Sequence, residues 1–100
     1  MTYYLHGWLT DDLSGGLVTS DLTSGERLVL AHTDQRLAMS YADAILRRFV
    51  PEGRIATMSL DCSVEELCHA VAGMVGPSDG IQLVLPDDPV YLEVINQTIV

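Results

Sequence analysis

Aspartates follow three apolar runs of this sequence, and they are the residues best suited by type and spacing to do chemistry. The runs end at His32, Leu60 and Leu85, and one or two aspartates come within three positions of each end. These aspartates are Asp34, Asp61, Asp87 and Asp88. Carboxylates gathered in one place suit Mg²⁺, a hard cation that prefers oxygen ligands. One interpretation is therefore a small magnesium-dependent enzyme or ligand sensor.

Helix capping explains the same residues without any ligand. Aspartate and serine are the preferred N-cap residues, so a chain that alternates strands and helices places an acid after each strand. The strands that precede these acids need not be neighbours in a sheet. We therefore favour capping over a metal site.

The spacing of apolar residues predicts the elements that hold the acids. Strands are predicted over residues 2–9, 17–22, 27–31, 54–60 and 81–85, with helices over 34–49 and from Ser63 to Gly76. The first three strands are predicted to form an antiparallel meander. The unbroken apolar run 81–85 is typical of a central strand. Residues 90–100 combine a helix start at Asp88-Pro89 with many β-branched residues, and we favour a helix.

This order predicts one compact domain over residues 1–100. The strand-helix-strand-helix-strand portion implies right-handed crossovers and some parallel pairing. We therefore predict the α+β class, with a mixed β-sheet and two or three helices packed on it.

The cysteines and histidines do not form a recognisable site. Five residues separate Cys62 from Cys68, and His69 is adjacent to Cys68, a spacing that does not match zinc sites. We expect Cys68 in the core, and Cys62 at a helix start without a companion base. His6 and His32 are expected to be packed and hydrogen-bonded within strands. No catalytic residue, metal or cofactor is predicted.

The charge balance limits the class of partner. The chain has 14 acidic residues and five cations, giving a net charge of -9, and all five cations are arginine. Nucleic acid and anionic lipid would repel such a protein, so we expect no direct contact with either. A partner attracted by charge would be basic. The alternative is that the acidity serves solubility alone.

The sequence also bears on location. It has no signal-peptide pattern and no apolar run near the length that crosses a membrane. We therefore expect a cytoplasmic protein.

Aromatic residues concentrate in the first predicted strand. Tyr3, Tyr4 and Trp8 are three of the six aromatic residues in the chain. Tyrosine and tryptophan are enriched among the residues that dominate interface energies. The predicted partner-binding residues are Tyr3, Tyr4, Trp8, Asp11, Asp12, Asp87 and Asp88. The alternative is that this strand is covered and belongs to the core.

From Arg27 onward the chain resembles the N-terminal domain of the SseB (enhanced serine sensitivity) family. The similar stretches are residues 28–34 before the first helix, 55–60 before the second and 80–86 near the end. The resemblance implies a small non-catalytic regulatory or interaction module.

Together these observations predict a small acidic protein that is not an enzyme. It would dock on a basic protein and inhibit or regulate it, as immunity proteins and phage-encoded inhibitors of nucleic-acid machinery do. The alternatives are an SseB-like accessory or oligomeric module, including a homodimer, and the magnesium-dependent activity considered above.

Overall fold

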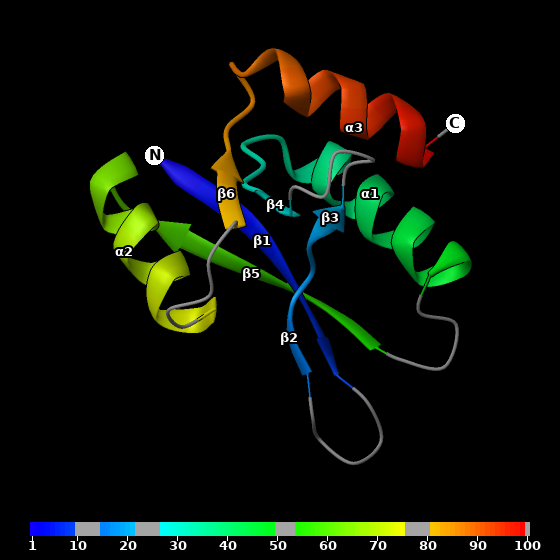
Figure 1. The fold of residues 1–100 in the computed structure, drawn as a ribbon, viewed down its shortest axis with the longest axis horizontal. Helices are drawn as coiled ribbons and strands as arrows, with labels where there is room; N and C mark the ends of the chain where they lie inside the picture. Colours follow the sequence, from blue (N-terminus) through cyan, green and yellow to red (C-terminus); the bar gives the residue numbers. More distant parts are fainter. Residues whose placement is uncertain (10–14, 22–26, 50–53, 76–80, 100) are drawn as a thin grey trace.

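A computed structural model describes residues 1–9, 15–21, 27–49, 54–75 and 81–99 (Figure 1). The strands are β1 (Thr2–Leu9), β2 (Gly15–Leu17), β3 (Ser20–Asp21), β4 (Arg27–Leu30), β5 (Arg54–Asp61) and β6 (Ile81–Val84). The helices are α1 (Gln35–Arg48), α2 (Val64–Val75) and α3 (Pro89–Ile99). Helices combined with antiparallel and parallel strands confirm the predicted α+β class.

The strands form two small sheets that meet at one point. One sheet has the order β2-β1-β5 and is antiparallel, and β5 pairs with β1 along all eight residues. The other has the order β3-β4-β6, in which β4 and β6 are parallel. The two sheets meet where Tyr4 and His32 exchange backbone hydrogen bonds of 2.7 and 2.9 Å.

The predicted meander and the predicted strand 17–22 are both wrong in detail. The chain pairs with β1 only as far as Leu17, and then pairs with β4 at Ser20 and Asp21. Between these pairings the Val18 amide donates to the His6 carbonyl at 2.9 Å. The single strand expected here therefore becomes two short strands in different sheets.

The predicted central position of the last strand is also wrong, because β6 lies at a sheet edge and β4 is central. Its apolar sequence has another cause. Ile81, Leu83 and Leu85 pack against one hydrophobic cluster, while Val84 belongs to a second cluster on the other side. An edge strand covered on both faces needs the same composition as a central one.

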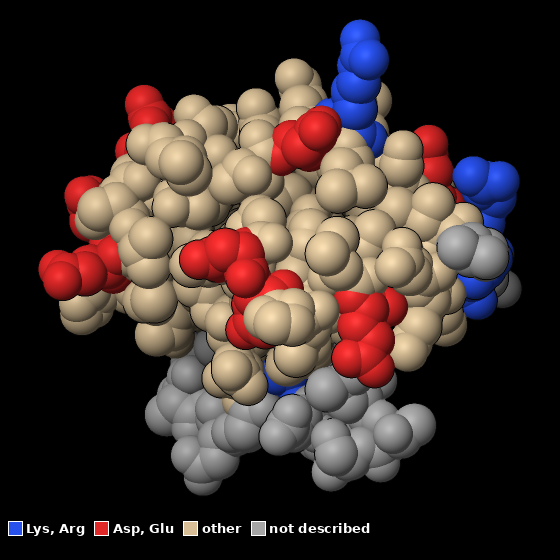
Figure 2. Space-filling view, turned by 90° about the horizontal axis from the view of Figure 1, so that it is seen from above, with Lys and Arg blue, Asp and Glu red and all other residues tan. Residues whose placement is uncertain are grey.

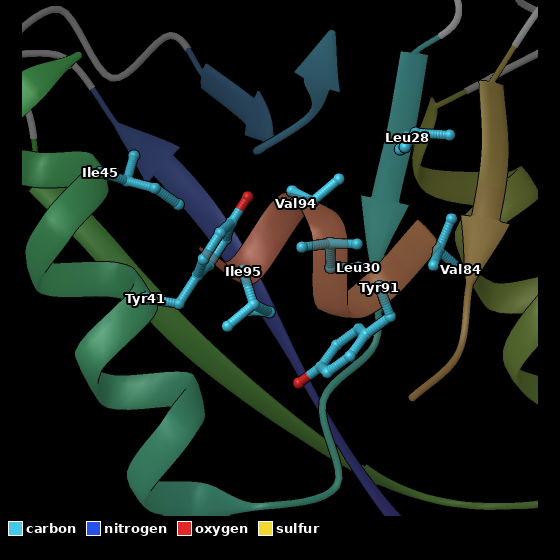
Figure 3. Packing of buried hydrophobic residues seen from close by; sticks show 8 residues of the cluster. All are labelled: Leu28, Leu30, Tyr41, Ile45, Val84, Tyr91, Val94 and Ile95. Atoms are coloured by element: carbon cyan, nitrogen blue, oxygen red, sulfur yellow. The ribbon is translucent and has the colours of Figure 1, made fainter. Parts of the chain in front are cut away.

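The two hydrophobic clusters lie on opposite sides of the strands. Tyr3 and Leu5 of β1 pack with Leu67 and Val71 of α2. The other cluster packs α1 and α3 against the second sheet (Figure 3). It consists of Leu28, Leu30, Tyr41, Ile45, Val84, Tyr91, Val94 and Ile95.

Four residues that the apolar spacing of the two predicted helices places on a buried face are exposed instead. Cys68 is exposed, so its predicted place in the core is wrong. Val64, Met74 and Phe49 are 43 %, 45 % and 68 % exposed. In α2 only Leu67 and Val71 are fully buried among the described side chains, because this helix has a single narrow contact face.

Side chains cap the three helices of the described ranges, namely Asp34 and Asp88 of the predicted aspartates and Ser63 in place of Asp61. Asp34 accepts hydrogen bonds from the Arg36 and Leu37 amides at 2.9 and 3.2 Å. Ser63 and Glu66 form a capping box, in which each side chain accepts from the other's backbone amide. Asp88 accepts from the Val90 amide at 3.0 Å and starts α3, so the helix predicted for the tail is confirmed.

The adjacent residues Asp87 and Asp88 allow a matched test of capping. Replacing Asp88 with alanine removes an N-cap and should lower the free energy of unfolding by about 1 kcal/mol. Asp87→Ala makes the same change in charge at an exposed turn residue and should alter it by less than about 0.5 kcal/mol. Urea unfolding of both variants measures the difference, and equal losses would show that the Asp88 cap contributes nothing.

Candidate functional site

The structure divides the predicted partner-binding residues into several groups. Tyr3 is only 5 % exposed and packs in the core under α2, so its predicted role as an exposed anchor is wrong. Tyr4 and Trp8 are half-buried on the opposite face of β1. Asp87 is exposed, and Asp88 is half-buried with its carboxylate on the first turn of α3. The predictions for Asp11 and Asp12 lie outside the described residues.

The directions of the strands bring most of the described acids to one end of the molecule. Both β4 and β5 run antiparallel to β1, and β6 runs parallel to β4. Their carboxyl ends therefore lie together, beside the amino terminus (Figure 1). We call this the acidic end. It carries Asp34, Asp61, Glu65, Glu66, Asp87 and Asp88.

Most of the arginines lie at the other end. Arg27 and Arg54 begin β4 and β5, and Arg47 and Arg48 lie in the last turn of α1. Only Arg36 follows a strand end, two residues after Asp34. Figure 2 looks down on the side toward which β6 points, where acidic side chains stand in separate groups with uncharged atoms between them and arginine side chains stand at the margin. Most of the described charges are therefore polarised along the strands.

The acids at this end do not converge on a metal. Across the five described ranges, no group of three or more His, Cys, Asp or Glu residues is placed to hold an ion. Asp34 and Asp88 direct oxygens to helix amides, and Asp61 lies 3.4 Å from the amino group of Met1. Their observed contacts are caps and an ion pair, which gives the magnesium hypothesis no support.

A buried cluster of four rings lies where the two sheets meet. His6 comes from β1, His32 follows β4, Tyr41 comes from α1 and Tyr91 from α3. Ring centroids of neighbours in this cluster are 5.0 to 5.8 Å apart. His32 Nδ1 is 2.7 Å from the Tyr91 hydroxyl, and His6 Nδ1 is 3.1 Å from Thr57 Oγ1. The cluster thus links elements from both sheets and two helices.

Burial holds these rings in their neutral forms. It lowers the pKa of His32 to about 4, and the neighbouring His6 adds to that effect. Burial also lowers the pKa of His6, against a smaller opposing effect of the Ala38 backbone. The pKa of Tyr91 is raised to about 12 by burial, by Asp34 and by Tyr41. The Nε2 atoms of both histidines have no hydrogen-bond partner, which costs about 1–3 kcal/mol for each buried group.

This histidine–tyrosine cluster is not open to a substrate in the observed conformation. His32 is fully buried and His6 is 4 % exposed. A general acid or base must come within hydrogen-bond reach of the reacting group. We therefore interpret the cluster as a structural connection between the sheets.

Part of this cluster could be predicted from the sequence. His6 and His32 were expected in packed, hydrogen-bonded strand positions, which is confirmed at Nδ1 of each ring. Their contact with each other and with the tyrosines was not predicted. Tyr41 lies in the predicted helix 34–49, but His32 and Tyr91 are 59 positions apart in the chain.

Comparison with family models, curated proteins and solved structures gave no match for this chain. The resemblance to the SseB family therefore stays a prediction. None of the helices in the described ranges has the length and apolar character needed to cross a bilayer.

The buried His32 predicts a specific dependence of stability on pH. Above pH 6.5 this histidine is neutral in both the folded and the unfolded chain. Between pH 6.5 and about 4, only the unfolded chain takes up the proton, so stability falls as the pH falls. The lowered pKa of His32 corresponds to a loss of about 3 kcal/mol in the free energy of unfolding. This loss is complete below about pH 4, where His32 is also protonated in the folded protein.

Chemical denaturation at several pH values measures this loss. His32→Phe should flatten the fall between pH 6.5 and 4, whereas substitution of the exposed His69 by glutamine should leave it unchanged. Identical pH profiles for wild type and His32→Phe would show that His32 is not buried in its neutral form.

The hydrogen bond between His32 and Tyr91 predicts strong coupling between the two side chains. Tyr91→Phe leaves His32 Nδ1 buried without its partner and should cost about 1–3 kcal/mol at pH 7. In His32→Phe/Tyr91→Phe both polar partners are absent, so the double variant should lose less than the sum of the single losses. A double-mutant cycle measures the coupling, and additive losses would rule out the hydrogen bond.

Proposed function

We propose that this protein is a small acidic binding protein that docks on a basic protein and inhibits or regulates it without catalysis of its own. The observation that carries the proposal is the polarity of the described charges. Six acids lie at the carboxyl ends of β4, β5 and β6, while four of the five arginines lie at the opposite end.

The acids of this end differ in how much they can attract a partner. Asp34 and Asp88 are engaged with helix amides, and the positive helix N-terminus offsets part of their charge. Glu66 is engaged with Ser63, and Asp61 with the amino group of Met1. Glu65 and Asp87 are exposed and lie outside these caps. They are therefore the strongest candidates to steer a basic partner.

Apolar side chains lie beside these acids. Met1 is 75 % exposed next to Asp61, and Val64, 43 % exposed, directly precedes Glu65. Interfaces combine an apolar centre with a charged rim. With Tyr3 in the core, Met1, Val64 and the half-buried Tyr4 offer apolar surface near these acids. Trp8 is half-buried too, but it pairs with Ile55 at the other end of β1.

Charge reversal tests the proposal. The bait is the wild-type chain or Glu65→Lys/Asp87→Lys, and proteins captured from an extract of the native cell are identified by mass spectrometry. We expect the wild type to capture proteins of high isoelectric point. The double variant should capture at least about tenfold less of these proteins, because like charges at an interface cost several kcal/mol.

The control is Asp43→Lys, which reverses an exposed acid in the middle of α1, away from the acidic end. It should capture the same proteins as wild type. Capture of acidic proteins only, or equal capture by wild type and the double variant, would refute the proposed docking surface.

A further inference from the structure

One long strand of this protein has an open edge. β5 pairs with β1 along all eight of its residues, and no other strand in the described ranges pairs with its second side. Its side chains at Arg54, Ala56, Thr57, Ser59 and Asp61 are exposed. Within the described ranges, the backbone groups that β5 directs away from β1 have no strand partner.

The edge lacks the features that usually protect such strands. Natural edge strands are short, or carry lysine, proline or a bulge that prevents pairing with another chain. β5 contains no lysine or proline, and its register with β1 is continuous from Arg54 to Asp61. Its charges stand only at its two ends. The opposite edge of the same sheet is β2, a strand of three residues.

We propose that β5 pairs antiparallel with β5 of a second copy of this chain, so that the two sheets continue into one across a two-fold axis. The occupant is a second copy because the strand complements itself in sequence and in charge. This inference does not depend on the basic partner proposed above, since Glu65 in α2 and Asp87 in the turn before α3 lie outside β5.

The side chains favour one register. A two-fold axis perpendicular to the sheet pairs only residues that lie on the same sheet face, so one residue of β5 lies opposite its own copy. When the two strands overlap as fully as possible, that residue is Thr57 or Met58. With Met58 on the axis, Ala56 lies opposite Leu60 of the second copy, and Thr57 lies opposite its Ser59. Apolar side chains then meet on the α2 face and hydroxyls on the other, pairs that stabilise a sheet. With Thr57 on the axis, Arg54 would face Leu60 and Ile55 would face Ser59.

The described charges also favour antiparallel pairing. Arg54 stands at one end of β5, near the cationic last turn of α1. Asp61 stands at the other end, followed by the first turn of α2 with Glu65 and Glu66. Antiparallel pairing brings the basic end of each strand to the acidic end of its partner. Parallel pairing would place like charges together.

Sedimentation equilibrium over a range of concentrations tests the pairing. The wild type should form a dimer that dissociates on dilution and no larger species, because pairing consumes the only long open edge described. Ala56→Lys places a charge among the apolar pairs and should raise the dimer dissociation constant at least about tenfold. Gln97→Lys adds the same charge at an exposed site on α3 and should leave that constant unchanged.

Unfolding curves establish that each variant remains folded. A wild type that stays monomeric at about 1 mM, where even weak pairs of Kd near 1 mM are half formed, would overturn the inference. So would a folded Ala56→Lys variant with unchanged self-association, or a wild type that forms open-ended assemblies.

Cross-linking and charge reversal test the register and the direction. In a Cys62→Ser/Cys68→Ser background, Met58→Cys should form a disulfide between copies on oxidation and Thr57→Cys should not. Cross-linking through Thr57→Cys alone would overturn the proposed register. Arg54→Asp brings an added acid to the acidic end of each partner strand and should weaken the dimer, and unchanged self-association of this folded variant would argue against antiparallel pairing.

Discussion

The backbone pairing of Tyr4 with His32 is the contact on which the rest of this structure depends. Two hydrogen bonds at this point join the sheet built on β1 to the sheet built on β4. Because the pairing is antiparallel, β4 takes the same direction as β5, and β6 follows β4. Three helices therefore begin at one end of the molecule, each with acids in its first turn or at its cap. The acidic end results from this topology, since the acids are far apart in the chain.

The side chain of His32 extends the same junction into the core. Its ring contacts His6, Tyr41 and Tyr91, so β1, α1 and α3 meet around a single residue. Neutral imidazole is compatible with this burial and imidazolium is not, because burial lowers the pKa. Two buried Nε2 atoms without partners are a cost that an apolar core would avoid. The stability of the junction is therefore tied to the protonation state of its histidines.

Local features of the fold could be predicted from the sequence because short-range chemistry determines them. Asp34, the Ser63–Glu66 box and Asp88-Pro89 each specify a helix start through backbone amides two or three residues away. The misses were long-range. The split of 17–22 between two sheets, the edge position of β6, and the burial of Tyr3 under α2 depend on which strands pair and which helix covers them.

The candidate site could be predicted in its charge but not in its geometry. Composition alone gave the sign of the charge that a partner would need. The gathering of Asp61, Glu65 and Asp87 at one end required the strand directions, and the contact of His6 with His32 required the junction itself. Cys68 was predicted to be buried because it falls among the apolar residues of its helix, but α2 leaves this position exposed. A periodic pattern identifies the face of a helix, and packing decides how wide the buried part of that face is.

Tyr4 and His32 join the two sheets in antiparallel register. Nuclear Overhauser spectroscopy of the ¹⁵N-labelled protein can detect this pairing, because amide protons approach closely across a hydrogen-bonded antiparallel pair. We expect an amide–amide cross-peak between Tyr4 and His32 and slow hydrogen exchange at both amides. A spectrum that shows the β1–β5 ladder without that cross-peak, with rapid exchange at His32, would contradict it.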